Sequence, residues 1–294
     1  MFNKVAIIGI GLLGGSLAKD IRSRELAKQI VGVCQSNDTG KFALAHNVVD
    51  EIQTLEVAVC DADLIVLATP MQTILPIVES MSNAVSANAI ITDVGSVKKQ
   101  LYDDVKSCCE NIMDRFVFAH PIAGGENSGV SASKNNLFKG KNVIITQTDE
   151  VSDDCVETIS KLWTSLGANV VSMSLQEHDS IFAKTSHLPH AIAFSLVNFL
   201  ANQANREQLF ELAAAGFYDF TRIASSNAEM WRDICITNQA EVLNAIDGYT
   251  EQLLLLRSLI NDADQQQILE YFSSAKESRD FGVTKKEITS NTDT

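Results

Sequence analysis

The chain has 294 residues, 46% of them hydrophobic, which is enough to bury a sizeable core in one large domain or two ordinary ones. Its formal net charge is −14 and no run of lysine or arginine occurs, which argues against nucleic acid or an anionic membrane as a partner. The chain has no apolar segment of about 18 residues and no CxxC pair among six scattered cysteines, so we expect no membrane span, no structural zinc site and a cytoplasmic protein with free thiols.

Short apolar runs alternate with helical stretches through the first half of the chain. The runs are KVAIIGI (4–10), IVGVC (30–34), LIVLAT (64–69), AIITDV (89–94), FVFAH (116–120), NVIIT (142–146) and ANVVSM (168–173). Strands that are buried on both faces of a parallel sheet have this composition. The alternation predicts a doubly wound α/β sheet of the Rossmann type, forming a dinucleotide-binding domain over residues 1–172.

A GxGxxG pattern lies between the first predicted strand and the first predicted helix. Its glycines are Gly9, Gly11 and Gly14. In this context the first glycine permits a tight turn, the second lets the backbone approach a pyrophosphate, and the third lets helix and strand pack closely. We therefore predict that this turn, with Leu12 and Leu13 inside it, binds a dinucleotide.

The end of the second strand bears on which dinucleotide binds. An acidic residue there would bind the ribose of NAD, and an arginine would favour the additional phosphate of NADP. The strand ends in GVCQSND, which puts Gln35 and Ser36 in the expected region and Asp38 slightly later. Both cofactors stay open, but nothing balances an additional phosphate charge in so acidic a chain, which favours NAD.

Three further motifs end predicted strands: LATP with Thr69 and Pro70, TDVGSVK with Ser96, and FAHP with His120. Ligands gather at the carboxyl edge of an open α/β sheet. We therefore predict that Thr69, Pro70 and Ser96 contact the cofactor and that His120 faces it. The alternative is an incidental surface histidine in a glycine-rich turn.

The second half of the chain is predicted to be helical. Residues 173–281 contain long stretches with helical apolar spacing and no convincing strand, and residues 282–294 are predicted to be a disordered tail. The stretch from Met230 to Ile260 is long for a globular helix. Its apolar face is expected to need a second subunit, so we predict a homodimer.

Two motifs in the helical half carry polar side chains that could form a site. SHLPH places His187 and His190 on one helical face, but a metal would need more ligands than His178 and Asp179 could add, so no metal is expected. DFTRIASS contains Arg222. Taken alone, a single arginine in such a stretch is interpreted as a surface charge.

Together the motifs resemble a known family. GIGLLGGSLA, TDVGSVK, HPIAGGENSG, SHLPH and DFTRIASSNAEMWRDI occur in the order and spacing of the prephenate dehydrogenases, which include arogenate and broad-specificity cyclohexadienyl forms. The resemblance extends from the first residues to about Phe281. It implies a Rossmann domain followed by a helical dimerisation domain. It also implies NAD(P)-dependent oxidative decarboxylation in tyrosine biosynthesis, of prephenate to 4-hydroxyphenylpyruvate or of arogenate to tyrosine.

The resemblance also implies roles for individual residues. His120 matches the catalytic base, and its reference pKa of about 6.5 suits that task. Ser96 matches the serine that orients this histidine and touches the nicotinamide end. Arg222 matches the arginine that binds a substrate carboxylate.

Other matched positions surround the substrate. His190 and, less closely, His187 match histidines that line the pocket, and Glu126 matches an acidic residue near its mouth. The family often has threonine or serine where this chain has Gly125, so a hydroxyl contact to the substrate is missing there. Tyrosine could inhibit by occupying the same pocket.

Two other functions compete with this interpretation. A β-hydroxyacid dehydrogenase would use a catalytic lysine in the helical half, for which Lys184 is the candidate. A dinucleotide-binding sensor without turnover would need GxGxxG but not His120, Ser96 and Arg222 together.

Overall fold

The computed structural model describes residues 1–125 and 127–292. The chain forms two compact units, and the division falls after Gln239. The predicted domain boundary at residue 172 lies inside the first unit, because α7 (Leu175–Phe182) packs against the strands before it and α11 (Ala228–Thr237) packs against α4 (Met71–Met81). Each unit is described separately below.

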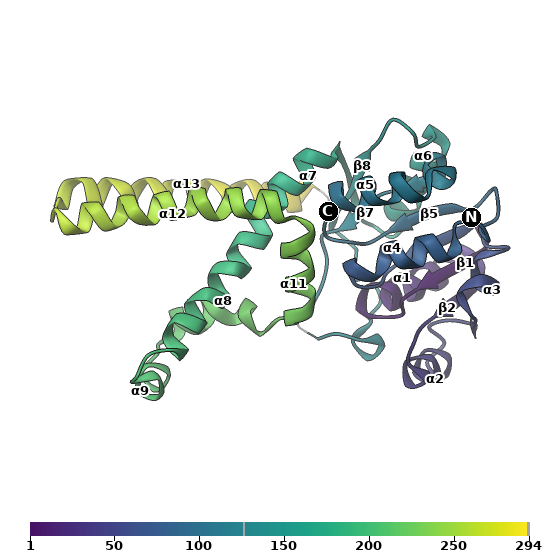
Figure 1. The fold of residues 1–294 in the computed structure, drawn as a ribbon, viewed down its shortest axis with the longest axis horizontal. Helices are drawn as coiled ribbons and strands as arrows, with labels where there is room; N and C mark the ends of the chain where they lie inside the picture. The colour runs from purple at the N-terminus through teal and green to yellow at the C-terminus, as the bar shows by residue number, and fades with distance from the viewer. Residues whose placement is uncertain (126, 293–294) are drawn as a thin grey trace. The chain divides into compact units, whose positions relative to one another are not determined.

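The first unit contains a six-stranded parallel sheet in the order β3-β2-β1-β4-β5-β6. Figure 1 labels β1, β2 and β5 of this sheet. Its strands are β1 (Phe2–Ile8), β2 (Ala27–Val33), β3 (Glu51–Ile52), β4 (Leu64–Leu67), β5 (Ile90–Asp93) and β6 (Phe116–Val117). The helices between them, besides α4, are α1 (Leu12–Ser23), α2 (Asn37–Ala45), α3 (Leu55–Val59) and α5 (Lys99–Cys108). This order is that of a Rossmann fold, which confirms the predicted fold class, and it reverses between β1 and β4, where such sheets bind ligands.

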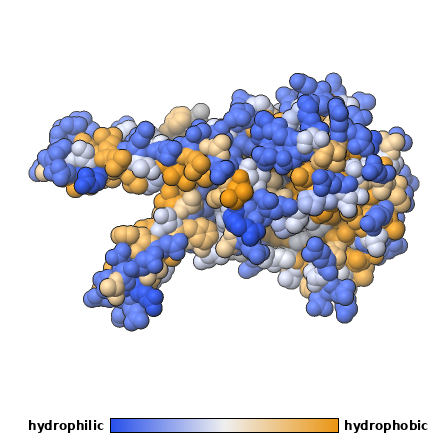
Figure 2. Space-filling model, in the orientation of Figure 1, coloured by the Kyte–Doolittle hydropathy of each residue, from blue (hydrophilic) through white to orange (hydrophobic). Residues whose placement is uncertain are grey.

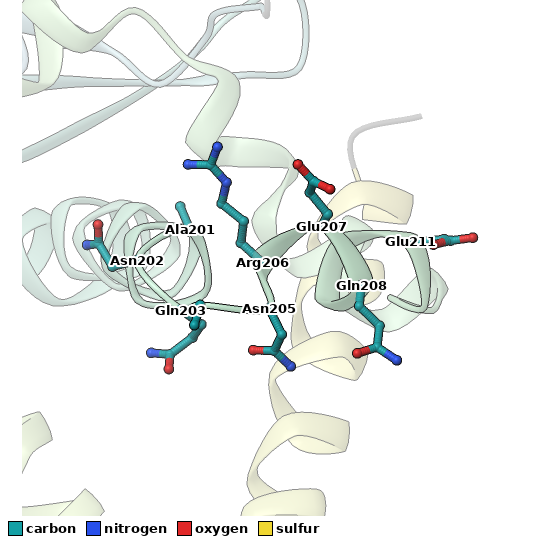
Figure 3. Close-up of a pocket in the computed structure, with 9 residues that line it drawn as sticks. Ala201, Asn202, Gln203, Asn205, Arg206, Glu207, Gln208 and Glu211 are labelled. Atoms are coloured by element: carbon teal, nitrogen blue, oxygen red, sulfur yellow. The ribbon is translucent and has the colours of Figure 1, made fainter.

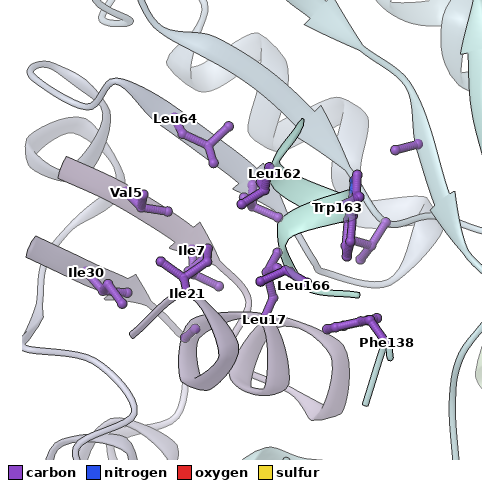
Figure 4. Packing of buried hydrophobic residues seen from close by; sticks show 14 of the residues in the cluster. Val5, Ile7, Leu17, Ile21, Ile30, Leu64, Phe138, Leu162, Trp163 and Leu166 are labelled. Carbon is purple, nitrogen blue, oxygen red and sulfur yellow. The ribbon is translucent and has the colours of Figure 1, made fainter. Parts of the chain in front are cut away.

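Two clusters of buried apolar side chains cover the two faces of this sheet. Figure 4 shows side chains of the first cluster from α1, from α6 (Asp153–Ser165) and from the strands: Leu17, Ile21, Leu162, Trp163, Val5, Ile7 and Leu64. All of these side chains are fully buried. Because both faces of the sheet are covered, the strands consist of continuous runs of apolar residues in the sequence.

A second sheet of three strands adjoins the first: β7 (Ala119–Pro121), β8 (Asn142–Gln147) and β9 (Asn169–Ser174). β7 is antiparallel to β8, and β8 is parallel to β9. The prediction of one strand over 116–120 is therefore wrong, since this run is split between β6 and β7. The backbone N–H of Ala119 donates to Asp93 Oδ1 at 3.1 Å, and Thr146 N–H donates to the Phe118 carbonyl at 3.0 Å, so the chain leaves the first sheet after Val117.

The helical part of the first unit begins at a capping box, in which Ser174 and Glu177 satisfy each other's backbone N–H groups. Its remaining segments, besides α7 and α11, are the π-helical turn η3 (Ala183–His187), α8 (Leu188–Ala201), α9 (Arg206–Glu211), α10 (Ala215–Thr221) and the 3₁₀ turn η4 (Arg222–Ser225). The apolar stretch expected as one long helix from Met230 is interrupted at Asn238, which ends α11.

The second unit consists of α12 (Gln239–Asn261) and α13 (Gln265–Thr292). α13 extends to Thr292, past residue 282, where the sequence predicts the start of a disordered tail; residues 293–294 lie outside the described residues. No proline interrupts this segment, and Lys276 pairs with Asp280 one turn later.

Much of the apolar surface of these two helices is exposed. Leu254 and Ile260 are each 59% exposed, and Leu269 is 61% exposed. Figure 2 shows hydrophobic surface along these helices among charged side chains. Within residues 1–125 and 127–292, however, none of the helices combines the length and hydrophobicity needed to cross a membrane.

Candidate functional site

The turn between β1 and α1 is built around its glycines. Gly9 has φ +98°, and a Cβ there would lie 2.7 Å from the carbonyl oxygen of Ala68. A Cβ on Gly14 would lie 2.1 Å from the Gly9 carbonyl oxygen. A Cβ on Gly11, by contrast, would meet no atom within 4 Å. The turn is therefore closed on the sheet side and open at the mouth of α1.

This opening fits a dinucleotide. The first turn of α1 carries no acidic residue, so its backbone N–H groups and helix dipole face the opening uncompensated. Thr69, after β4, has a buried hydroxyl with no hydrogen-bond partner among the described residues, which a polar ligand atom would satisfy. Leu12 and Leu13 are half-buried beside the turn, and Pro70 is exposed at the start of α4.

The end of β2 leads directly into α2. Gln35 is exposed, and the Ser36 hydroxyl caps α2 by accepting the Thr39 N–H at 3.4 Å. Asp38 lies in the first turn of the helix.

A chain of three side chains begins at His120 on β7. The Nδ1 atom of His120 lies 2.8 Å from Nε2 of His178, and Nδ1 of His178 lies 2.7 Å from Oδ1 of Asp179. The Asp179 carboxylate accepts the backbone N–H groups of Lys98 at 2.9 Å and Lys99 at 2.8 Å, at the start of α5. α7 is thus joined to both β7 and α5 at one point.

The TDVGSVK motif is organised by a buried ion pair between Lys98 and Asp93, both of which are 0% exposed. Asp93 also accepts the N–H groups of Gly95 at 2.8 Å and Ala119 at 3.1 Å, so it fixes the loop after β5 and the start of β7. Ser96 is half-buried in this loop. Among the described residues no hydrogen bond joins Ser96 to His120; the partner of His120 Nδ1 is His178.

The histidines of the site are held in their neutral form. Burial, with smaller contributions from His178, Lys98 and His187, lowers the pKa of His120 well below its usual 6.5. Burial also lowers the pKa of His178, against the opposing effect of Asp179. It lowers the pKa of His187 to about 4. At neutral pH these imidazoles are therefore uncharged.

A cavity of about 210 Å³ has Arg222 and His190 in its wall. Its lining residues are Gly124, Gly125, His190, Arg222, Ile223, Ser225 and Ser226. The His190 ring stacks on Trp231 at 3.7 Å, which fixes its orientation. The structure thus brings together Gly125, His190 and Arg222, which come from three separate segments of the chain.

The remaining predicted site residues are placed differently. His187 is 1% exposed and interacts with the Asn238 side chain at 3.2 Å, so it lies behind the cavity wall. A Cβ on Gly125 would lie 3.5 Å from Leu12, which puts the loop after His120 against the glycine turn. Glu126 lies outside the described residues.

Sequence reasoning missed the structural importance of His178 and Asp179, which it considered only as metal ligands. The described residues contain no group of three or more His, Cys, Asp or Glu side chains placed to hold a metal ion. The adjacent pair at the start of the helical half was the available signal, but its partners are supplied by β7 and α5.

A larger hollow of about 790 Å³ surrounds the turn between α8 and α9 (Figure 3). Apart from two alanines, its lining side chains are polar or charged and include Arg206, Glu207 and Glu211. It contains none of the residues predicted to act on a substrate or cofactor.

Comparison with known proteins identifies relatives along most of the chain. Residues 17–172 match the family model for the prephenate dehydrogenase nucleotide-binding domain, and residues 174–274 match that for the prephenate dehydrogenase dimerization domain. The prephenate dehydrogenase of Bacillus subtilis (strain 168) is 33% identical over 283 residues, covering 95% of this chain and 76% of that protein.

Solved structures agree in fold over a similar length. The crystal structure of prephenate dehydrogenase from A. aeolicus in complex with hydroxyphenyl propionate and NAD+ has a TM-score of 0.90 and 36% identity, covering 95% of this chain and 98% of that one. Synechocystis arogenate dehydrogenase has a TM-score of 0.81 and 28% identity, covering 94% and 99% respectively.

Proposed function

The chain belongs to the prephenate dehydrogenase family, and on that premise we propose that it catalyses the NAD(P)-dependent oxidative decarboxylation of prephenate to 4-hydroxyphenylpyruvate, or of arogenate to tyrosine. The observation that carries the proposal is the position of Gly125, which lines the cavity of Arg222 and His190 and also lies against Leu12 of the glycine turn. A substrate in that cavity would be next to a dinucleotide bound at the turn.

The proposed reaction needs few groups from the protein. The chemistry that a dinucleotide bound at Gly9, Gly11 and Gly14 supplies is acceptance of a hydride from the ring carbon bearing the hydroxyl. His120 takes the hydroxyl proton as general base, and its neutral state at pH 7 leaves it able to do so. Aromatisation of the ring then drives the loss of the carboxylate as CO₂, and the resulting phenolate oxygen takes the proton back from His120. Ser96, in the loop beside His120, remains a proposed contact of the nicotinamide end.

NAD(P)H formation by the purified chain with prephenate, and separately with arogenate, tests this function directly. Absence of turnover with both substrates would favour a dinucleotide-binding sensor. Turnover of a β-hydroxyacid in their place would favour the alternative dehydrogenase, although Lys184 is exposed and donates a hydrogen bond to Ser180 at 3.0 Å.

Arg222 is proposed to bind a substrate carboxylate in the cavity. Replacing it with alanine should raise KM for the substrate by about 10–100-fold, the cost of one charged hydrogen bond, and should lower kcat less. Arg232→Ala is the matched control, because that arginine pairs with Asp233 on α11 and is not in the cavity wall. An unchanged KM in Arg222→Ala would mean that the carboxylate is bound elsewhere.

We propose that NAD is the preferred cofactor. Asp38 in the first turn of α2 disfavours a 2′-phosphate, and the preference is expected to be roughly tenfold in kcat/KM, because only one or two net interactions differ. Gln35→Arg should shift the ratio towards NADP. Steady-state kinetics with both cofactors measures this, and a wild-type preference for NADP above about a hundredfold would contradict the placement of the ribose at the end of β2.

We propose that the chain works as a homodimer, with the exposed apolar surface of α12 and α13 covered by a second copy. The match of residues 174–274 to a dimerization domain supports this proposal. Light scattering at micromolar concentration should give about twice 32.0 kDa. Leu254→Glu, which puts a charge on that surface, should shift the equilibrium to monomer, while a wild-type mass of 32.0 kDa would contradict the proposal.

Two further proposals concern the setting of the enzyme. All six cysteines are free, as a reducing compartment would keep them, which supports a cytoplasmic location. Tyrosine resembles the aromatic product, and we propose that it competes for the Arg222 cavity. Competitive inhibition against the substrate, lost in Arg222→Ala, would support this site.

A further inference from the structure

We propose that His178 and Asp179 position the catalytic base: they hold His120 in the tautomer that carries its proton on Nδ1, so that the lone pair of Nε2 is free to accept the substrate proton. The proposal rests on His120 being the base in the proposed function. It concerns two residues that the sequence motifs do not assign to the reaction.

The Asp179 carboxylate is the acceptor at the end of this series of hydrogen bonds. Both oxygens of Asp179 accept backbone N–H groups, from Lys98 at 2.9 Å and from Lys99 at 2.8 Å. These N–H groups belong to the start of α5, where the helix dipole also stabilises a negative charge. Asp179 is therefore held as a carboxylate, which can only accept hydrogen bonds.

Each following proton position is then determined. Since Asp179 can only accept, His178 must donate from Nδ1 across the 2.7 Å contact. A neutral imidazole has one N–H, so Nε2 of His178 has only a lone pair. His120 must then donate from Nδ1 across the 2.8 Å contact, which leaves its Nε2 unprotonated.

Packing fixes the positions of the His120 and His178 rings relative to each other. Phe182, also on α7, contacts both His120 and His178, with ring centroids 5.0 Å and 4.7 Å apart respectively. Asn238 donates to the Asp179 carbonyl at 3.0 Å and interacts with Nδ1 of His187, so the end of α11 holds this part of α7 in place. His178 is 0% exposed and Asp179 is 2% exposed, so water does not compete for the contacts between them.

The same contacts act after proton transfer. When His120 accepts a proton at Nε2, its Nδ1–H still donates to His178. The Asp179 carboxylate, at the other end of this series of hydrogen bonds, then stabilises the new positive charge. No proton needs to move along the chain. The pair therefore orients the base and stabilises its protonated form, while only His120 exchanges a proton with the substrate.

The first test requires no turnover. In ¹⁵N NMR spectra of the histidine-labelled full chain, assigned with a His120→Asn variant, His120 should show a protonated Nδ1 and an unprotonated Nε2 at neutral pH. In His178→Leu, which has no acceptor, His120 should show a mixture of tautomers. A wild-type His120 protonated on Nε2 would overturn the proposal. This measurement needs no substrate, so its outcome can be distinguished from failure of the proposed function. If the proposed function were wrong, the wild-type chain would be inactive with both prephenate and arogenate.

The second test separates positioning from structural support. His178→Leu should lower kcat by about 10²–10⁴-fold with little change in KM, the range expected for a misoriented or wrongly protonated base. His178→Gln should restore much of the loss, because the side-chain carbonyl of glutamine can accept from His120 near the position of Nε2. Equal kcat in the leucine and glutamine variants, with equal unfolding temperatures, would show that the hydrogen bond does not matter and would overturn the proposal.

Discussion

Replacing His120 with asparagine is expected to lower kcat by about 10²–10⁴-fold, the usual contribution of a general base, while KM for the substrate changes little. Asparagine keeps a polar group able to interact with His178 but cannot accept the hydroxyl proton and carry its charge. Steady-state formation of NAD(P)H measures both constants. Turnover close to that of the wild type would remove His120 from the mechanism.

The matched control is His46→Asn. His46 is exposed at the end of α2, stacks on Phe42 and lies in none of the proposed contacts with substrate or cofactor. Its replacement should leave kcat and KM unchanged. A loss of activity in both variants would indicate a general effect on folding rather than on chemistry.

The pH profile gives an independent check on the same residue. Burial lowers the pKa of His120 well below 6.5, so the free enzyme keeps its base unprotonated from neutral pH down into the acid range. The acid limb of kcat/KM should therefore lie below pH 6.5, and His120→Asn should remove it. A wild-type acid limb at pH 7 or above would mean that His120 is not desolvated as the structure indicates.

The features predictable from the sequence are those encoded locally. The Rossmann order follows from apolar runs alternating with helical stretches, and the turn at Gly9 follows from the glycine spacing. The prediction that His120 ends a strand of the parallel sheet was wrong, because His120 is the middle residue of β7 in the second sheet. That error arose because β6 and β7 are separated by hydrogen bonds to the Asp93 side chain and from the Thr146 backbone, which no local pattern reveals.

The parts that could not be predicted depend on contacts between distant segments. Asp179 binds the start of α5, 80 residues earlier in the chain, and Asn238 reaches back 59 residues to the Asp179 carbonyl. The sequence shows that His178 and Asp179 are adjacent polar residues, but it does not show their role. A buried histidine next to an aspartate suits a metal site and a structural pair equally well. The cavity of Arg222 likewise exists only after η4 and the loop after β7 come together.

Asp93→Ala should destabilise the first unit by about 3–5 kcal/mol at pH 7, the cost of leaving one member of a buried ion pair without its partner. Lys98 is 0% exposed and loses its counterion, while the N–H groups of Gly95 and Ala119 lose their acceptor. The free energy of unfolding from urea titration measures the effect. The double variant Asp93→Leu/Lys98→Met, which removes both charges, should recover much of the stability.

The destabilisation of Asp93→Ala should also diminish at alkaline pH. Burial already lowers the pKa of Lys98 below 10.5 in the folded chain, while Asp93 raises it, so removing Asp93 lowers this pKa further. Between the folded pKa and 10.5 the unfolded chain binds more protons than the folded chain, so the free energy of unfolding of the variant must rise with pH across that window. Urea titrations at pH 7 and about pH 9.5 test whether the free energy of unfolding of the variant rises with pH. At about pH 9.5 an unfolded lysine, with its pKa of about 10.4, is still mostly charged. A pH-independent difference between variant and wild type would show that the lost acceptor for Gly95 and Ala119, rather than the unpaired charge of Lys98, accounts for the destabilisation.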